Sequence, residues 1–411
     1  MEVKKIIIIA IMLIVALSTN VKSAEPEITA NSVAVIDCID GKILYSKNMD
    51  ERLYPASLTK VLTAIIVVEN CDMKQEITMT QSAINNVKSG YLTSNIKPGE
   101  VFTVEELLNV LLISSCNDVA NVLAENICDT EEEFIQKMNQ KAREIGCTNS
   151  NFVNSCGEHD TNHYSTTHDM ALIGKYAMQY DVIKEAVNKI SYRLRSTDIY
   201  TKDDRLYETS NEMILSGSKN YCKYAEGIKT GFTTPAGNCL MVYTKKDDMP
   251  LVTVVMKATT SDSRYEDARK AFEYAYANNT IRKIVSQGTN LQTLSIKKAT
   301  EDTKKLNAIV SKDIFAVVKD ENLKTNIEPE IIINNNLKAP IEKGTVIGKV
   351  TYEIEGKKYS EELVAETEVK KSKSNIFFIV LFIIIILFFG YLRISTLYKR
   401  KKVLRKIKGK I

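Results

Sequence analysis

The strongest constraint on this chain is an uncharged stretch near its C-terminus, IFFIVLFIIIILFFGYL at 376–392. Seventeen residues are the short limit for a helix that crosses a bilayer. Because the stretch is apolar on all sides, it does not fit a helix that lies on a membrane surface. The charges beside it argue against the remaining alternative, a buried core helix. We therefore expect a transmembrane anchor at 376–392.

The residues behind this anchor, 393–411, include nine Lys or Arg and no acidic residue. Basic segments beside a membrane span stay in the cytoplasm. The preceding body would then lie outside, held by the C-terminal helix. The sequence thus predicts a single-pass protein of the cell membrane, with an extracytoplasmic body and a basic cytoplasmic tail.

The N-terminus has the layout of a secretory signal peptide. Lys4 and Lys5 precede an apolar run, and small or polar residues follow it. We predict a signal peptide over 1–23, with cleavage after Ser23; cleavage after Ser18 also fits the pattern. An N-terminal anchor that is not cleaved is the alternative.

Composition narrows the class of protein. The 411 residues are enough for two domains. The net charge of +4 is small and comes largely from the C-terminal tail, so no nucleic-acid partner is expected. The eight cysteines are scattered and include no CxxC pair, which favours mostly free, buried thiols over a disulfide framework.

The body between the terminal segments divides by pattern into two domains. Residues 25–280 mix helical and strand-like stretches without strict alternation, which favours an α+β fold with helices packed on an antiparallel sheet. Residues 285–369 contain short strand-like runs split by Asn, Gly and Lys, which predict a small all-β domain. Residues 370–375, KKSKSN, form a polar linker to the anchor.

Periodicity and capping residues place the elements of the first domain. The predicted strands are two in 32–46, joined by an Asp-Gly turn, and a group in 226–256. The predicted helices are a buried one over 56–70, two over 103–127 with a break near SSCND, an amphipathic one over 130–146, one over 165–180 with Thr166 and Asp169 spaced as a capping box, and a last one over 264–279.

The stretch YPASLTK at 54–60 places Ser57 three residues before Lys60, at the start of the predicted buried helix. Residues so spaced lie on one helix face. Because desolvation lowers the pKa of a buried lysine, such a lysine can take the proton of a serine nucleophile. Roughly two or three such spacings are expected by chance, so an ordinary helix start with a solvated lysine is the alternative.

A second candidate, Ser115 and Asn117, stands at the predicted break between two helices. The hydroxyl could relay a proton, and the amide could hold a peptide carbonyl. This spacing is also common by chance, and an ordinary helix cap is the alternative.

A third candidate is Lys229-Thr230-Gly231, which is the one KTG in the chain and lies on a predicted strand. The edge of a strand can pair with the backbone of an extended peptide, and Gly231 lets that backbone approach closely. Lys229 and Thr230 offer a charge and a hydroxyl to a carboxylate. An edge-strand lysine before a turn is the alternative.

In the order SxxK, SxN, KTG, the three motifs are the signature of penicillin-binding proteins and serine β-lactamases. YPASLTKVLTA, SSCNDVANVLAE, HYSTTHDMALI and EGIKTGFTTPAGNCL resemble the low-molecular-mass penicillin-binding proteins, which are serine-type D-alanyl-D-alanine carboxypeptidases (peptidase S11-like), over about residues 30–280. LKAPIEKGTVIGKV resembles the later β domain of that family, and the membrane segment stands where the family carries its anchor. The resemblance implies the penicillin-binding transpeptidase fold followed by a small all-β domain.

The resemblance also implies an activity and roles for three residues. The enzyme would remove the terminal D-alanine from peptidoglycan stem peptides that end in D-Ala-D-Ala. Ser57 attacks the peptide bond between the two D-alanines and becomes acylated, Lys60 is its general base, and Ser115 passes a proton to the leaving amine. β-Lactam antibiotics would acylate Ser57 in the same way and leave slowly.

Further positions would bind the substrate by the same resemblance. Asn117 orients the peptide, and Lys229 and Thr230 of the KTG strand bind the terminal carboxylate beside Gly231. The backbone N–H groups of Ser57 and Phe232 form the oxyanion hole. Arg264 matches a family arginine near the carboxylate.

Some features leave alternatives open. Cys116 stands where the family usually has glycine, which puts the path of this loop in question. A DD-endopeptidase acting on cross-linked peptidoglycan and a catalytically idle penicillin-binding sensor are the other functions considered. A β-lactamase fits less well, because those enzymes are shorter and lack the β domain. His159, His163 and His168 have spacings that suit no zinc pattern well, so no metal and no cofactor is expected.

Overall fold

The computed structural model describes residues 24–323, 325–372 and 376–408. The predicted signal peptide, 1–23, lies outside the described residues. The chain divides into two units, of which the first runs to Arg282 and also includes Ala316–Thr325. The second unit holds Lys283–Phe315 and the residues from Asn326 onward.

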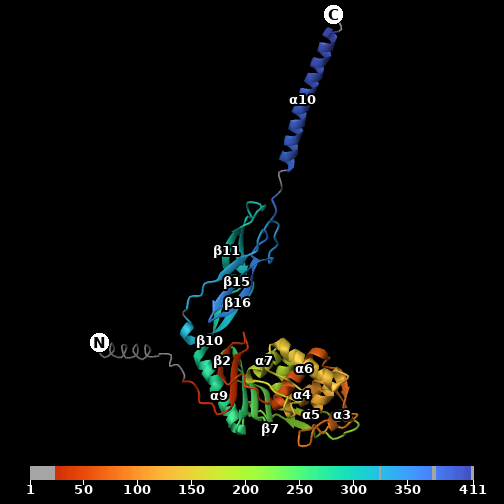
Figure 1. The fold of residues 1–411 in the computed structure, drawn as a ribbon, viewed down its shortest axis with the longest axis vertical. Coiled ribbons are helices and arrows are strands. Elements are labelled where there is room, and N and C mark those ends of the chain that lie inside the picture. The colour runs from red at the N-terminus through yellow and green to blue at the C-terminus, as the bar shows by residue number, and fades with distance from the viewer. Residues whose placement is uncertain (1–23, 324, 373–375, 409–411) are drawn as a thin grey trace, which may run out of the picture. The chain divides into compact units, whose positions relative to one another are not determined.

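The first unit is built on a five-stranded antiparallel sheet with the strand order β2-β1-β9-β8-β7 (Figure 1). Its strands are β1 (Ser32–Asp37), β2 (Ile43–Lys47), β7 (Ala225–Thr233), β8 (Gly237–Lys246) and β9 (Met249–Ala258). Strand β1 pairs with β9, from Ser32 opposite Met256 to Asp37 opposite Leu251. The sheet therefore joins the two ends of the unit's sequence.

Helices cover both faces of this sheet, which explains why SVAVID of β1 is buried at every position. Successive side chains of a strand point to opposite faces. Val33 and Val35 pack in a core with Phe272 of α9 (Ser261–Asn278). Ala34 and Ile36 belong to the larger core formed with the other helices.

The remaining elements of the first unit surround that larger core. The helices are α2 (Thr59–Asn70), α3 (Gln81–Asn85), α4 (Val104–Ser114), α5 (Asn117–Ile127), α6 (Glu131–Ile145), α7 (Thr167–Ala177) and α8 (Asp181–Val187). Two short antiparallel pairs are β3 (Glu76–Thr78) with β4 (Val101–Thr103), and β5 (Ser191–Arg193) with β6 (Leu206–Glu208). The 3-10 turns are η1 (Ala56–Leu58) and η2 (Glu212–Ile214).

The antiparallel sheet with packed helices confirms the predicted α+β class, and local differences have local causes. The predicted helix over 56–70 begins as the separate turn η1. The turn between β1 and β2 is longer than an Asp-Gly pair, because the Asp37 carboxylate accepts hydrogen bonds from three backbone N–H groups of the loop. Helix α9 begins at Ser261, earlier than predicted, because Thr260 and Ser263 cap it reciprocally.

The predicted capping box of α7 is half formed. Thr166 accepts a hydrogen bond from the Asp169 backbone N–H. The Asp169 carboxylate does not reach back to the cap; it accepts hydrogen bonds from the Asn149 backbone and the Ser150 hydroxyl. A tertiary contact thus takes the place of the local one.

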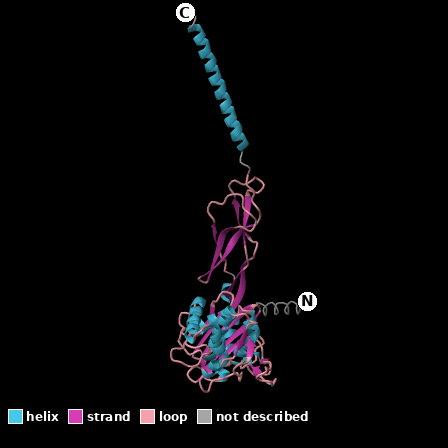
Figure 2. Cartoon of the chain, turned by 90° about the vertical axis from the view of Figure 1, so that its right-hand side faces the viewer, coloured by secondary structure: helices cyan, strands magenta, loops and turns pink. Residues whose placement is uncertain are grey.

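The second unit contains a five-stranded antiparallel sheet with the order β11-β12-β16-β15-β14, in agreement with the predicted all-β domain (Figure 2). Its strands are β11 (Asn290–Ser295), β12 (Lys305–Val310), β14 (Glu330–Ile333), β15 (Val346–Ile354) and β16 (Lys357–Ala365). A two-residue turn, Glu355-Gly356, with positive φ at both positions, joins β15 to β16. The chain also contains β10 (Asn279–Val285), β13 (Ile314–Lys319) and η3 (Asp320–Asn322).

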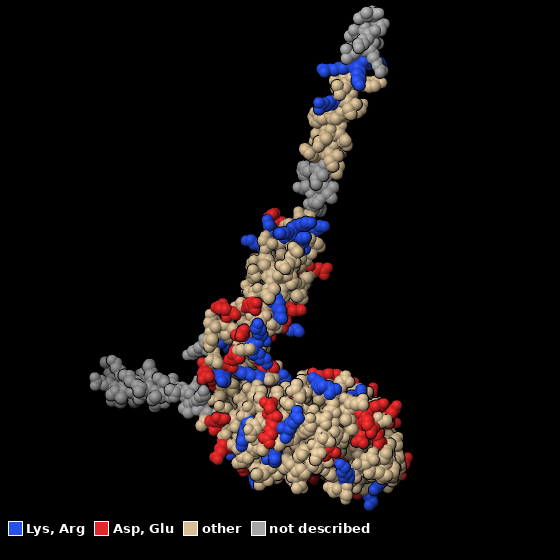
Figure 3. All heavy atoms as spheres, in the orientation of Figure 1, with Lys and Arg blue, Asp and Glu red and all other residues tan. Residues whose placement is uncertain are grey.

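Helix α10 (Ile376–Lys408) runs through the predicted anchor and continues into the predicted basic tail. Within the described residues it is the one helix long and apolar enough to cross a membrane, over Val380–Lys402. Lys and Arg side chains gather toward its C-terminal end, beyond an uncharged stretch (Figure 3). This helix has the composition of a membrane anchor with a basic extension.

A buried ion pair ties the β5–β6 hairpin to the loop before β4. Arg205 Nη1 donates to Glu100 Oε2 at 2.8 Å and Arg205 Nη2 donates to Glu100 Oε1 at 3.0 Å. The two side chains are 5% and 0% exposed. The guanidinium also lies over the rings of Phe102 and Tyr200. Removing one partner would leave the other charge buried without compensation.

We expect Glu100→Gln to lower the free energy of unfolding by about 3 kcal/mol, and the thermal midpoint by roughly 6 to 12 °C. The matched control is Glu106→Gln. Glu106 pairs with Arg195, whose side chain is half exposed, so this change should cost less than about 1 kcal/mol. Thermal unfolding followed by circular dichroism measures both effects. Equal losses in the two variants would show that burial of the Glu100 pair is irrelevant.

Candidate active site

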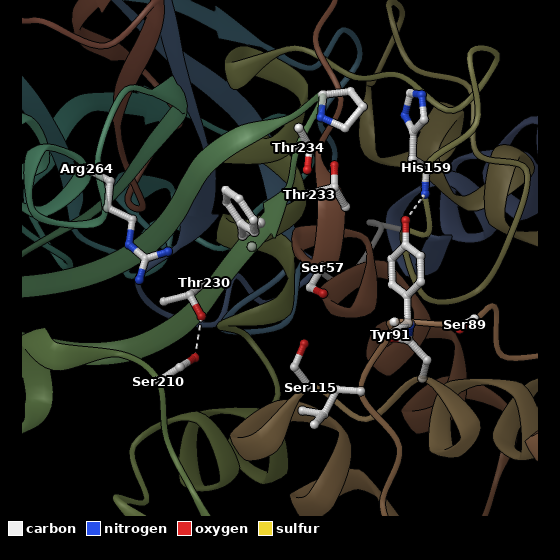
Figure 4. A pocket seen from close by; sticks show the side chains of 16 residues that line it. Ser57, Ser89, Tyr91, Ser115, His159, Ser210, Thr230, Thr233, Thr234 and Arg264 are labelled. Atoms are coloured by element: carbon white, nitrogen blue, oxygen red, sulfur yellow. Dashed lines mark hydrogen bonds between the residues drawn. The ribbon is translucent and has the colours of Figure 1, made fainter.

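Ser57 lies in η1, the 3-10 turn that leads into α2. The preceding residue, Ala56, has a left-handed backbone with φ +49°. The Ala56 carbonyl packs against Gly157, where a Cβ would lie 1.9 Å from the Ala56 oxygen. Any side chain at position 157 would therefore displace η1. This contact sets the turn that presents Ser57 to the cavity shown in Figure 4.

Lys60, in the first turn of α2, is completely buried. Its Nζ donates hydrogen bonds to Ser57 Oγ at 3.2 Å, to Asn117 Oδ1 at 2.5 Å and to the Cys156 carbonyl at 2.6 Å. Burial is the main cause that lowers the pKa of Lys60, because desolvation disfavours the ammonium. The structure thus places an amine of weakened basicity in contact with the Ser57 hydroxyl.

Ser115 and Asn117 come from the predicted break between two helices. Ser115 ends α4 with a left-handed backbone, φ +68°, and Cys116 is the residue before α5. The break turns the Ser115 side chain toward the same cavity as Ser57 (Figure 4). The Asn117 backbone N–H donates to the Leu92 carbonyl at 2.9 Å, which holds the loop before α4 against the site.

The KTG segment lies on β7, whose strand packs directly against η1. A Cβ on Gly231 would lie 3.1 Å from the Ser57 backbone nitrogen, so glycine permits this approach. The hydroxyls of Thr230 and Ser210 share a hydrogen bond of 2.5 Å. Lys229 is 2% exposed, and burial, with a contribution from the nearby Lys60, lowers the pKa of Lys229 to about 7.

Arg264 reaches the cavity from α9. The side chain is largely buried, and Nη2 donates to the Tyr265 hydroxyl at 2.9 Å. Its Nε has no hydrogen-bond partner among the residues that the structure describes. Phe232, next to Gly231, is 60% exposed and forms part of the cavity wall.

These residues surround a cavity of about 640 Å³. Seven of the nine predicted site residues line it, and Lys60 and Lys229 lie buried behind the wall. Sequence reasoning missed the other lining residues, which are Ser89, Gly90, Tyr91, Leu92, His159, Ser210, Thr233, Thr234 and Pro235. Most of these come from loops without a motif, so that only the fold brings them to the cavity.

The clustered histidines separate in the structure. His163 is buried; its Nδ1 accepts from the Val153 backbone N–H and its Nε2 contacts Thr59 Oγ1 at 2.8 Å. Burial lowers the pKa of His163 to about 3, so the ring is neutral. It packs against Thr59, the first residue of α2. His159 packs edge-on against Tyr54, whereas His163 packs edge-on against Phe152. All eight cysteines are free thiols and five of them are buried.

The geometry suits acyl transfer to a serine. A hydroxyl and a buried amine are in contact, the strand that bears Gly231 lies beside the Ser57 nitrogen, and a largely buried arginine reaches the same cavity. Backbone N–H groups aimed at a developing oxyanion are the largest electrostatic contribution in such chemistry. The arrangement fits a peptide that ends in a carboxylate.

Comparison with known proteins identifies the family to which this chain is similar. A family model described as D-alanyl-D-alanine carboxypeptidase (peptidase S11) matches residues 19–260, and one described as penicillin-binding protein 5, C-terminal domain, matches 280–371. The chain is 30% identical to the D-alanyl-D-alanine carboxypeptidase DacF of Bacillus subtilis, over 85% of this chain and 88% of the relative. It is 26% identical to the D-alanyl-D-alanine endopeptidase of Escherichia coli, over 60% of this chain and 77% of the relative.

Among solved structures, the peptidoglycan synthesis regulatory factor PBP3 of Streptococcus pneumoniae matches with a TM-score of 0.70. It is 26% identical, and the match covers 84% of this chain and all of that one. The predicted fold class is thereby confirmed.

We expect Lys229→Met to raise the free energy of unfolding at pH 7 by on the order of 3 kcal/mol. The pKa of this lysine falls from 10.5 to about 7 on folding. Between these values the unfolded state binds more protons, so wild-type stability rises with pH and the advantage of the variant should shrink toward pH 10. Thermal unfolding at pH 6, 7 and 9 measures this, with the exposed Lys257→Met as control. A Lys229 variant less stable than wild type would contradict the expectation.

Proposed function

The chain belongs to the D-alanyl-D-alanine carboxypeptidase family, peptidase S11, whose members are serine hydrolases, and we propose that it removes the terminal D-alanine from peptidoglycan stem peptides. The observation that carries this proposal is the contact between Ser57 Oγ and the buried Lys60 Nζ, at 3.2 Å. A serine hydroxyl is a weak nucleophile until a neighbouring base takes its proton.

The reaction proceeds through an acyl-enzyme. Lys60 accepts the hydroxyl proton while Ser57 Oγ attacks the carbonyl between the two D-alanines. The resulting oxyanion accepts hydrogen bonds from the backbone N–H groups of Ser57 and Phe232. Ser115 passes a proton to the amine of the departing D-alanine, the carbon–nitrogen bond breaks, and an ester remains on Ser57. Water then attacks the ester and releases the shortened peptide.

Three side chains bind the end of the substrate. Lys229 and Thr230, on β7, and Arg264, on α9, receive the terminal carboxylate. The buried Arg264 Nε has no partner in the described part of the chain, and a buried polar group of this kind gains a hydrogen bond when a carboxylate binds. The carboxylate also favours the ammonium form of Lys229, because an opposite charge nearby raises a lysine pKa. Asn117 orients the peptide from the opposite wall.

Two alternatives use the same site or leave it idle. A DD-endopeptidase would cleave cross-links with the same residues. The similarity to an endopeptidase of Escherichia coli supports this alternative. The match of residues 280–371 to the C-terminal domain of penicillin-binding protein 5 favours the carboxypeptidase. An idle penicillin-binding sensor would use the Ser57–Lys60 contact for acylation by penicillin, but it would release no D-alanine from a peptide.

We also infer that α10 anchors the enzyme in the cell membrane, with the catalytic unit outside. The apolar part of the helix and the Lys and Arg residues beyond it follow the positive-inside pattern. The substrate lies outside the membrane, so this orientation places the active site beside the cell wall.

Ser57→Ala should lower D-alanine release from a soluble peptide ending in D-Ala-D-Ala by about 10³-fold or more, and it should abolish labelling by a fluorescent penicillin. Ser89→Ala, another hydroxyl of the cavity wall, is the matched control and should keep both activities. Release of D-alanine is compared with cleavage of a cross-linked dimer by the same preparation. An unlabelled, inactive wild type would sink the proposal, and a preference for the dimer would favour the endopeptidase.

Truncation after residue 369 should release the protein from the membrane, because it removes the helix that interacts with lipid. Fractionation of cells that express the full-length and the truncated protein, with penicillin labelling of each fraction, measures this. Labelled truncated protein that stays in the membrane fraction would rule out α10 as the anchor.

A further inference from the structure

We propose that Glu158 is a positioning residue of this active site, which holds the side-chain amide of Asn117 in one orientation and supplies a counter-charge to Lys60. The inference rests on the roles proposed above for Asn117 and Lys60. It concerns a residue outside the three motifs, in the loop that follows Gly157.

Glu158 is a buried carboxylate, with a side chain that is 5% exposed. Its Oε1 accepts hydrogen bonds from Asn117 Nδ2 at 3.3 Å and from the Lys88 backbone N–H at 3.2 Å. Its Oε2 lies 3.9 Å from Lys88 Nζ, on a side chain that is 60% exposed. Burying a carboxylate is costly unless it is hydrogen-bonded or paired. These contacts offset the cost of burying Glu158, and one of them joins it to Asn117 of the candidate site.

The amide of Asn117 lies between two opposite charges. Its Oδ1 accepts from Lys60 Nζ at 2.5 Å, and its Nδ2 donates to Glu158. In the flipped orientation the amide NH₂ would face the ammonium and the carbonyl oxygen would face the carboxylate, so both contacts would become repulsive. Because Nδ2 carries two hydrogens, one remains to hold a peptide carbonyl in the cavity that Asn117 lines.

The charge of Glu158 also acts on Lys60 through this amide. Burial favours the neutral amine, and the cation of Lys229 acts in the same direction. Cys156, Cys116, Glu158 and Asp118, in that order, oppose them. Burial raises the pKa of the Cys156 thiol to about 11 and that of Cys116 to about 12, so both thiols are neutral. The Asp118 carboxylate is bound by the backbone N–H and the hydroxyl of Ser94. The other titratable groups that face Lys60 or Glu158 are Lys88, Glu131 and His163.

Removal of the carboxylate charge therefore has a defined sign. Lys60 accepts a proton only as the neutral amine, so the rate of acylation falls on the acid side as Lys60 becomes protonated. Without the negative charge of Glu158 the ammonium is less favoured, and the acid limb of the rate profile moves to lower pH. A glutamine at this position keeps an oxygen acceptor for Asn117, whereas a leucine removes both the charge and the acceptor.

The test uses the full-length protein in detergent. Second-order rate constants for acylation by a fluorescent penicillin are measured from pH 5 to pH 10, with KM for a soluble peptide ending in D-Ala-D-Ala. Glu158→Gln should move the midpoint of the acid limb down by roughly half to one pH unit and leave KM within about twofold of wild type. Glu158→Leu should give the same shift and raise KM about fivefold or more.

Glu131→Gln is the matched control, because Glu131 also faces Glu158 but has no contact with Asn117 among the described residues. It should leave the acid limb and KM close to those of wild type. An unshifted acid limb in Glu158→Gln overturns the proposal, and this variant alone decides if Glu158→Leu does not fold. A wild type that no penicillin labels at any pH would refute the proposed function instead.

Discussion

The burial of two lysine side chains beside a single cavity is the constraint around which the rest of this candidate active site is arranged. Lys60 and Lys229 are 0% and 2% exposed. Desolvation and mutual repulsion both disfavour their charged forms. The surrounding groups offset this cost: Asn117 and the Cys156 carbonyl accept from Lys60, and the Thr230 carbonyl accepts from Lys229. Burying such an amine lowers the stability of the folded protein. Because its pKa is lowered, the amine is more often neutral, and only the neutral form can accept a proton from Ser57.

Two glycines allow the backbones to approach closely enough for this arrangement. Gly231 brings β7 within van der Waals contact of the Ser57 nitrogen, and Gly157 brings its loop against the Ala56 carbonyl. The loop then presents two groups to the site in succession, the Cys156 carbonyl to Lys60 and the Glu158 carboxylate to Asn117. The position of Ser57 therefore depends on backbone contacts from segments about 100 and 174 residues further along the chain.

The sequence anticipated much of this site and missed a definable part. It identified Ser57, Lys60, Ser115, Asn117 and the KTG strand because their side chains recur in fixed short spacings, and the helix break at SSCND formed as expected. It did not identify Ser210, His159 or Glu158, which belong to loops without periodicity or motif. The predicted capping box at Thr166 has only one of its two hydrogen bonds, because the Asp169 carboxylate accepts instead from Asn149 and Ser150, in a loop distant in sequence. Sequence analysis also missed the short strand pairs β3–β4 and β5–β6, because three residues are too few for a periodic signal.

By itself, the amino-acid sequence determined the local secondary structure and the features that follow from composition. Apolar periodicity set the helices and strands, turn residues ended them, and the apolar run at 376–392 marked the helix that could cross a membrane. Only the tertiary structure decided which polar groups meet. Lys60 lies against Ser57 because of helical spacing, but its other two partners come from α5 and from the loop beside Gly157. Burial and the neighbouring charges set the protonation of Lys60 and Lys229, and both quantities depend on the folded surroundings and are absent from the order of residues along the chain.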